Sequence, residues 1–535
     1  AKALEPPLEE LVWTIAVARL ILGSDMSIQA PPNLSPGQLT ALLNAGINDW
    51  GGVSPVTPDH VNPEAPWPEL ESLGSITAAN GKVLAPRLPI YPAYVGDPDT
   101  WLAKPLVRHV LRHADAAGLG REDLWVTGHS THTPPAPTQR EPVSRAVTTV
   151  LGKSEQGEEL TEQDIVTLFT ARGNDFGRVC DAADLLRQKQ VGDAVSYVVN
   201  RNINYTNVCY FHCKFCAFSK GRTHEDLRGK PYDLDLDEVA RRAAEAWSRG
   251  ATEVCLQGGI HPDYTGQTYL EICDAIKRVA PDMHIHAFSP LEVWQGAETL
   301  GLSLETFLAR LRDAGLRSLP GTAAEILDDE VRAILCPDKI NTEQWFQVMR
   351  AAHSVGLRST ATMMFGHVDH PRHWARHLQR VRALQVETGG FTELVPLAFV
   401  AMEAPLYRRG LARNGPTYRE AVLVHAVARI VLGDVIPNIQ ASWVKMGPKG
   451  AQQCLQAGAN DLGGTLMNES ITRAAGAEHG QELAPHIIEA LAQDLGRVAR
   501  HRNTLYGDVG DERHQAALQA APLAPIVNTP LQRAS

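Results

Sequence analysis

The sequence predicts an α/β protein whose largest part, residues 160–508, is a (β/α)8 barrel. Short runs rich in β-branched and apolar residues alternate there with longer segments of helical periodicity. Eight such units in roughly 300 residues are typical of a barrel, although an open doubly wound sheet is an alternative. The expected strands are residues 195–203, 253–256, 283–288, 316–319, 357–364, 392–397, 438–441 and 459–462, separated by helices such as 238–249, 304–314 and 342–355.

The composition argues against several classes of protein. The 535 residues are 44% hydrophobic and 21% charged, which is enough apolar material for at least two domains. Lys and Arg total 50 against 61 Asp and Glu, and this net charge of −11 argues against nucleic acid or an anionic membrane as a partner. No apolar run reaches the ~18 residues of a membrane span, and the acidic start does not resemble a secretory signal. We expect a cytoplasmic protein that acts on small molecules.

The chain contains an internal repeat. Residues 18–23, 28–30 and 45–52 match residues 428–433, 439–441 and 457–464 in the same order, which indicates two related modules. The second copy ends a long module, whereas the first copy begins near residue 1. The expected organisation is a C-terminal remnant of a first barrel at 1–128, a Pro-rich linker at 129–159, a complete barrel at 160–508 and a poorly ordered polar tail at 509–535.

Three cysteines cluster directly after the first expected strand. Cys209, Cys213 and Cys216 have the spacing C-x3-C-x2-C. Three thiolates on one loop can hold three irons of a [4Fe-4S] cluster and leave the fourth iron open to a chelating ligand. Phe215 is expected to pack near such a cluster, and Lys214 and Lys220 could offset its charge.

Two other kinds of metal site compete with this interpretation. A structural zinc site could combine the three thiolates with His212, although the paired C-x2-C halves of zinc ribbons are missing. An electron-transfer cluster would need a fourth cysteine, and the next two, Cys255 and Cys273, fall on an expected strand and an expected helix. The cysteines outside the motif are most simply core or surface thiols: Cys180, Cys255, Cys273, Cys336 and Cys454.

The motif, placed at the end of a first barrel strand, resembles that of the radical S-adenosylmethionine (SAM) superfamily. The resemblance implies that the open iron binds the amino and carboxylate groups of SAM. At the end of the second strand, Gln257-Gly258-Gly259 stands where the superfamily has a Gly-Gly-Glu stretch whose backbone meets the methionine amino group. Glycine permits such a close approach. Ile260 replaces the acidic third residue, so the implied cofactor contacts come from the backbone.

Longer stretches resemble the tyrosine-using half of the FO synthase family, which makes the deazaflavin precursor of coenzyme F420. They are residues 200–207, 257–262, 321–327, 363–367 and 393–397. The resemblance implies that a 5′-deoxyadenosyl radical takes a hydrogen atom from L-tyrosine. The 4-hydroxybenzyl fragment then joins 5-amino-6-(D-ribitylamino)uracil, and an electron donor is needed. A cyclising barrel should carry its own C-x3-C-x2-C motif, which this sequence does not repeat, so we expect that barrel to be missing or separate.

Several further residues are candidates for the site. Glu325 is expected to bind the cofactor, with a helix N-terminal carboxylate as the alternative role. Thr360, Thr362 and Met364 share one strand face, which suits a polar cavity as well as a core. The side chains near strand ends that could meet the uracil or ribityl chain, or form structural hydrogen bonds instead, are His286, Glu393 and Gln440; His261 and His367 are possible proton carriers.

Two other functions remain open at this stage. An enzyme similar to aminofutalosine synthase, from menaquinone biosynthesis, would share the barrel and much of its loop pattern. A catalytically idle partner could instead use its truncated front as an interaction surface. A half-barrel leaves strand edges and apolar faces uncovered. We therefore expect residues 1–125 to associate or aggregate.

Overall fold

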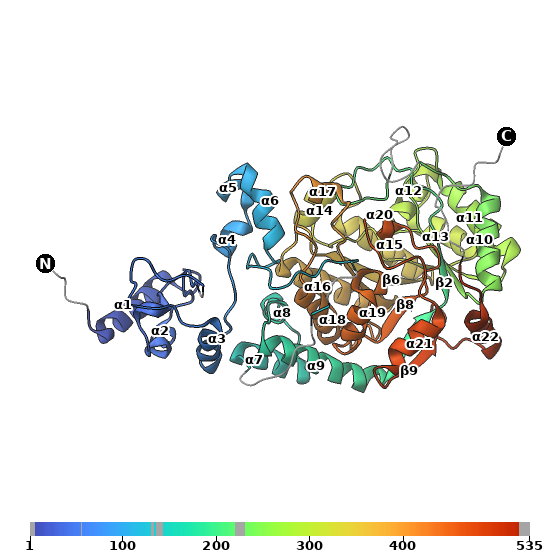
Figure 1. Ribbon diagram of the computed structural model, residues 1–535. Helices are drawn as coiled ribbons and strands as arrows, with labels where there is room; N and C mark the ends of the chain where they lie inside the picture. The colour runs from blue at the N-terminus through green and yellow to red at the C-terminus, as the bar shows by residue number, and fades with distance from the viewer. Residues whose placement is uncertain (1–5, 55, 130–132, 135–142, 220–230, 524–535) are drawn as a thin grey trace.

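The computed structural model describes residues 6–54, 56–129, 133–134, 143–219 and 231–523. Lys220, one of the two lysines expected near the cysteine motif, lies outside these ranges. No helix of the described ranges is long and apolar enough to cross a membrane. Figure 1 shows a small N-terminal group of helices, α1 to α3, set apart from the large α/β body.

Parallel strands form the centre of the α/β body. β2 to β7 form one sheet in chain order, and β8, β1 and β9 form a second sheet. Single bridges from Leu394 to Ile439 and from Gln440 to Asp461 carry the pairing from β7 to β8, and β1 leads directly into β2. The pairing thus returns to its start, so the predicted barrel is confirmed. The strands are β1 (Ala194–Val198), β2 (Asn200–Ile203), β3 (Glu253–Leu256), β4 (His284–Ala287), β5 (Leu316–Leu319), β6 (Arg358–Phe365), β7 (Phe391–Ala398), β8 (Asp461–Gly464) and β9 (Val498–His501).

The eight predicted strands are recovered with three differences, the first being that the expected strand 195–203 is divided into β1 and β2. Residues 438–441 pair through isolated bridges and do not form a named strand. β9, which no pattern predicted, pairs with β1. The helices of this body are α7 (Arg145–Glu155), α8 (Glu162–Phe169), α9 (Asn174–Val191), α10 (Leu236–Ser248), α11 (Gly266–Val279), α12 (Pro290–Leu300), α13 (Leu304–Asp313), α14 (Asp329–Leu335), α15 (Thr342–Ser354), α16 (Pro371–Thr388), α17 (Pro405–Arg408), α18 (Tyr418–Leu432), α19 (Trp443–Leu455), α20 (Ile471–Ala474), α21 (Pro485–Gln493) and α22 (Asp511–Gln519).

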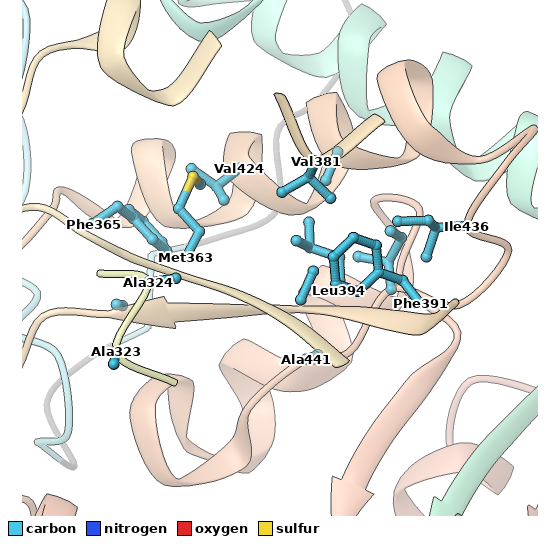
Figure 2. Packing of buried hydrophobic residues seen from close by; sticks show 14 of the residues in the cluster. Ala323, Ala324, Met363, Phe365, Val381, Phe391, Leu394, Val424, Ile436 and Ala441 are labelled. Carbon is cyan, nitrogen blue, oxygen red and sulfur yellow. The ribbon is translucent and has the colours of Figure 1, made fainter. Parts of the chain in front are cut away.

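The side chains of β6 alternate between the outside and the inside of the barrel. Ala361, Met363 and Phe365 pack outward in the core, because successive side chains of a strand point to opposite faces. On the opposite face, Thr360, Thr362 and Met364 line cavities inside the barrel. Figure 2 shows the outward packing, in which residues of β6 and β7 meet residues of α16 and α18: Met363, Phe365, Phe391, Leu394, Val381 and Val424.

The N-terminal group has a hydrophobic core of its own. Ile15, Leu42, Ile47, Trp50 and Leu73 belong to a cluster separate from the barrel core. The group is followed by short helices that lie nearer the barrel (Figure 1). The helices before the barrel are α1 (Leu8–Leu22), the 3-10 helix η1 (Pro32–Leu34), α2 (Leu39–Ala45), α3 (Leu70–Ala79), α4 (Pro92–Val95), α5 (Pro98–Trp101) and α6 (Lys104–His113).

The sequence repeat is also a structural repeat. In each copy, an arginine on the first helix donates from Nε to a glycine carbonyl oxygen at 2.8 Å and from Nη2 to an asparagine Oδ1. That asparagine oxygen also accepts the backbone N–H of an isoleucine. The residues are Arg19, Gly46, Asn48 and Ile28 in the first copy and Arg429, Gly458, Asn460 and Ile439 in the second.

The structure extends the repeat beyond the matching sequence blocks. Arg87 Nε donates to Asp49 Oδ2 at 2.9 Å, and its guanidinium lies 4.8 Å from the ring centroid of Tyr91. In the second copy, an equivalent arginine donates to an equivalent aspartate at 2.6 Å and lies 4.0 Å from a tyrosine ring. These residues are Arg502, Asp461 and Tyr506. The same side-chain contacts therefore occur within residues 8–91 and, separately, within residues 418–506.

The expected boundary at residue 128 does not coincide with the packing. Ala116 and Trp125 belong to the core cluster of the barrel. The backbone N–H of Ala116 donates to Glu420 Oε1 at 2.7 Å, and that of Gly128 donates to the Lys445 carbonyl at 2.8 Å. Residues 116–128 thus pack as part of the barrel.

The expected linker and tail also contain ordered elements. α7 lies within the expected linker, and it buries Val147, Val150 and Leu151 in the barrel core. The prolines that suggested a linker precede this helix. α22 lies within the expected tail, where the Arg513 guanidinium stacks 3.6 Å from a ring centroid of Trp247.

The duplicated arginines generate a prediction. Arg429 is fully buried and donates to four backbone or side-chain oxygens of the barrel, so Arg429→Ala should destabilise the barrel by about 2–4 kcal/mol. Arg19→Ala should instead loosen only residues 8–54, because its partners all lie there. Hydrogen exchange read by mass spectrometry separates the two effects. Faster exchange in the barrel of Arg19→Ala would contradict this division.

Candidate active site

The cysteine loop follows β2 and is anchored to three neighbouring segments. The backbone N–H of Tyr210 donates to the Ile260 carbonyl at 3.1 Å, and that of Lys214 donates to the Leu335 carbonyl at 2.8 Å. The Leu406 N–H donates in turn to the Lys214 carbonyl at 2.7 Å. These contacts fix the loop at the ends of several barrel strands, where barrel enzymes place their chemistry.

The three thiols line one cavity of about 260 Å³. Cys209, Cys213 and Cys216 are half-buried. All eight cysteines lie in the described ranges, and the other five do not line this cavity. Nor does His212, the fourth ligand of the zinc alternative. Three soft ligands converging on one cavity fit the predicted iron–sulfur cluster.

Burial raises the pKa of the Cys209 and Cys213 thiols above the ordinary value. Metal binding requires the thiolate form, so the two thiols would have to lose their protons when iron binds. The Lys339 ammonium opposes the shift at both sulfurs.

Two glycines that follow β3 allow the chain there to pack closely against the segment that leads into the cysteine loop. A Cβ on Gly258 would lie 2.3 Å from the Tyr205 ring, and a Cβ on Gly259 would lie 2.2 Å from the Val208 carbonyl oxygen. The Gly259 N–H donates to the Thr206 carbonyl at 2.9 Å. The need for glycine therefore arises from the approach of the chain to itself. Both glycines and Gln257 line the thiol cavity, as predicted for cofactor-binding residues.

Glu325 lies in the same cavity and pairs with a lysine. Lys339 Nζ donates to Glu325 Oε1 at 2.8 Å, and both side chains are largely buried. Burial alone would lower the pKa of Lys339, but the attraction of Glu325 and of the nearby thiols outweighs it and holds the pKa above its ordinary value. Lys339 Nζ also lies 5.5 Å from the ring centroid of Phe215. The N-cap of the next helix is Asp328, so Glu325 is not the capping carboxylate.

A second cavity of about 210 Å³ lies inside the barrel. It shares Gln257, Thr322, Thr362, Leu397 and Lys445 with the thiol cavity, so the two cavities adjoin. The predicted substrate-binding residues that line it, along with Thr360, are His286, Thr362, Glu393 and Gln440.

Glu393 is the centre of a hydrogen-bond network in the second cavity. Its Oε2 accepts from Tyr506 Oη at 2.7 Å, from Gln440 Nε2 at 3.3 Å and from Arg502 Nη2 at 3.5 Å. Arg502 also donates to both carboxylate oxygens of Asp461. Burial raises the pKa of Glu393 to about 7, although Arg502 opposes the shift.

Two charged residues of this cavity, Lys445 and Arg502, were not predicted from the sequence. Lys445 lines both cavities and donates from Nζ to Thr472 Oγ1 at 3.1 Å, and burial lowers its pKa. Arg502 follows the unpredicted strand β9, and Lys445 lies on α19, so neither stands directly after an expected strand. The spacing Arg-x3-Tyr, shared by Arg87 with Tyr91 and Arg502 with Tyr506, is the sequence signal that could have identified Arg502.

Unpartnered polar atoms also point to a ligand in the second cavity. Four buried oxygens have no hydrogen-bond partner among the described residues, and each belongs to a residue that lines this cavity. A buried polar atom without a partner is costly, so a polar ligand or water is expected to bind it. The atoms are Asn202 Oδ1, Thr322 Oγ1, Thr504 Oγ1 and Glu469 Oε2.

The two histidines proposed as proton carriers lie outside both cavities. His261 Nδ1 accepts the Asp263 N–H at 3.1 Å, next to the Tyr264 ring. His367 is buried beside Asp369, and its Nδ1 accepts the Val368 N–H at 2.8 Å. Both have structural partners where they lie.

Two family models match the chain. "Radical SAM superfamily" matches residues 203–381, and "CofH/MqnC C-terminal region" matches residues 388–513. The cofactors of the superfamily are a [4Fe-4S] cluster and SAM, and the three thiols fit that cluster.

Solved structures share the fold. Methylornithine synthase PylB matches with a TM-score of 0.52 and 18% identity, and the match covers 69% of this chain and 100% of PylB. The hydrogenase maturase HydG from Carboxydothermus hydrogenoformans matches with a TM-score of 0.50 and 16% identity, covering 67% of this chain and 80% of that one.

Curated relatives are considerably more similar. The FO synthase of Streptomyces coelicolor is 45% identical over 95% of this chain and 64% of that protein. The chain thus spans slightly less than two thirds of the length of this relative. A protein of Methanopyrus kandleri, named 5-amino-6-(D-ribitylamino)uracil--L-tyrosine 4-hydroxyphenyl transferase, is 50% identical over 66% of this chain and 98% of that protein. The chain therefore belongs to the radical SAM family that contains the FO synthases and this transferase.

Proposed function

We propose that the barrel transfers the 4-hydroxybenzyl group of L-tyrosine to 5-amino-6-(D-ribitylamino)uracil. The observation that carries the proposal is the junction of two cavities, one lined by three thiols and the other by polar side chains such as Asn202, Glu393 and Gln440. The 50% identity to a transferase named for this reaction supports it. The intact cysteine motif argues against an idle partner.

In this proposal, the thiol cavity holds the cofactors. Cys209, Cys213 and Cys216 would hold three irons, and the Gly258–Gly259 backbone with the Glu325–Lys339 pair would border SAM. When bound, the cluster and SAM supply abstraction of a hydrogen atom by a cofactor-derived carbon radical, which requires one electron from a donor. The surrounding apolar side chains, with Phe215 among them, exclude water from this reaction.

The second cavity would hold the diaminouracil. A uracil ring and a ribityl chain present several donors and acceptors, and the cavity offers matching partners. Glu393 and Gln440 would bind the ring or the chain, and Arg502, which donates to Glu393, would orient its carboxylate. Thr362 and Lys445 lie at the junction of the cavities, where the tyrosine fragment would have to meet its acceptor.

We also propose that residues 8–91 are the closing part of a first barrel, the cyclising one. Residues 418–506, which contain the equivalent contacts, close the second barrel. α18 is buried along its whole length, whereas its counterpart α1 exposes Trp13, Leu20 and Ile21. The rest of a barrel would cover this apolar face. The sequence contains a single C-x3-C-x2-C motif, so ring closure to FO would need another cluster-bearing barrel.

An anaerobic assay tests both proposals. The reconstituted protein with dithionite, SAM, L-tyrosine and the diaminouracil should produce 5′-deoxyadenosine and the hydroxybenzyl adduct, measured by mass spectrometry. FO fluorescence should appear only after a cyclising barrel is added. Formation of 5′-deoxyadenosine only with a menaquinone-pathway substrate would contradict the transfer proposal, and FO formation by this chain alone would contradict the proposal for the first barrel.

The raised pKa of Glu393 generates a prediction about pH. Protonated Glu393 stabilises the fold, because its pKa rises from 4.5 to about 7 on burial. This stabilisation is fully present below the unfolded-state value of 4.5 and is lost as the pH rises through about 7. The melting temperature of the wild type should therefore fall relative to that of Glu393→Gln between about pH 5 and pH 8. Parallel pH profiles of the two proteins would show that Glu393 does not titrate in this range.

A further inference from the structure

A buried carboxylate of α12 lies against the Gly258 backbone. Glu292 is 1% exposed, and it lines the thiol cavity. Its Oε1 accepts from Tyr205 Oη and from the Gly258 N–H at 3.3 Å. Its Oε2 accepts from the Ser289 N–H at 2.6 Å and from the Ser289 hydroxyl. The second oxygen completes the helix cap, whereas the first accepts from Tyr205 and from Gly258, which lines the same cavity.

The four donors to this carboxylate are all neutral. Each oxygen accepts one backbone N–H, and burial raises the pKa of Glu292 above its ordinary value. Among the described residues, Glu292 forms no ion pair with a lysine, arginine or histidine, in contrast to Glu325, which pairs with Lys339. A buried carboxylate without a cation is costly, and a cationic ligand in the adjoining cavity would offset that cost.

Glu292 brings a carboxylate to a glycine stretch that has no acidic residue of its own. Ile260 stands in the chain where the superfamily pattern has an acidic residue. Glu292 follows β4, the strand next to β3, and brings a carboxylate to the Gly258 backbone from there. We propose that Glu292 binds the amino group of the methionine portion of SAM. This inference rests on the SAM-binding role of the thiol cavity and not on the identity of the substrates.

The proposed contact with Glu292 should affect only ligands that carry the amino group of the methionine portion. SAM and S-adenosylhomocysteine both carry the amino group, whereas 5′-methylthioadenosine lacks it. Loss of a charged hydrogen-bond acceptor should weaken binding roughly ten- to a hundredfold. Glu292→Gln should therefore weaken SAM and S-adenosylhomocysteine by this factor and leave 5′-methylthioadenosine unchanged. Glu298→Gln, an exposed change on the same helix, is the matched control and should leave all three affinities unchanged.

Calorimetry of the anaerobically reconstituted protein measures these affinities, with iron content and melting temperature recorded for each variant. A second variant, Glu292→Asp, keeps the charge but withdraws it from the cavity, and it should show the same ligand pattern with a smaller loss. Wild-type SAM affinity in either folded variant would overturn the inference, and so would an equal loss for 5′-methylthioadenosine. Because the readout is cofactor affinity, failure to form the hydroxybenzyl adduct would contradict the proposed substrates and not this contact.

Discussion

The site depends on one close approach, that of Gly258 and Gly259 to the cysteine loop. The two glycines pack against Tyr205 and the Val208 carbonyl at distances that a side chain would not allow. Gly259 and Tyr210 add backbone hydrogen bonds across the same contact. Because the chain after β3 and the cysteine loop meet at this contact, the thiols and the Gly-Gly backbone line one cavity. A larger residue at either glycine would displace the loop that carries the thiols.

The thiol cavity and the second cavity differ in the buried charges that surround them. Around the thiols, Lys339 provides a positive charge that Glu325 partly balances, while Glu292 receives only neutral donors. Inside the barrel, Arg502 joins Glu393 and Asp461, and four oxygens remain unpartnered among the described residues. These features suit a cationic cofactor beside a cluster and a polar, uncharged ring system beyond it. Low dielectric strengthens each contact, so the two ligands are expected to be held in a fixed relation.

Local patterns in the sequence predicted the barrel and the cysteine loop. The alternation in β6 put Thr360, Thr362 and Met364 on one face without deciding between a cavity and a core, and the structure shows that this face lines the cavities inside the barrel. β9 escaped prediction because only one of its four residues is buried, so no alternating apolar pattern marks it. Arg502, Lys445 and Glu292 reach the cavities through tertiary packing, which short-range patterns do not encode. The prolines before α7 concealed a helix whose buried face is formed by only a few apolar residues.

The central claim is that one barrel holds a cluster-bound cofactor and the diaminouracil in adjoining cavities. A crystal structure of the reconstituted protein with SAM and 5-amino-6-(D-ribitylamino)uracil, with the iron located by anomalous scattering, tests it most directly. The account predicts iron between Cys209, Cys213 and Cys216, and the uracil ring within hydrogen-bond distance of Glu393 or Gln440. Iron at the thiols with the uracil bound outside the barrel would contradict the account.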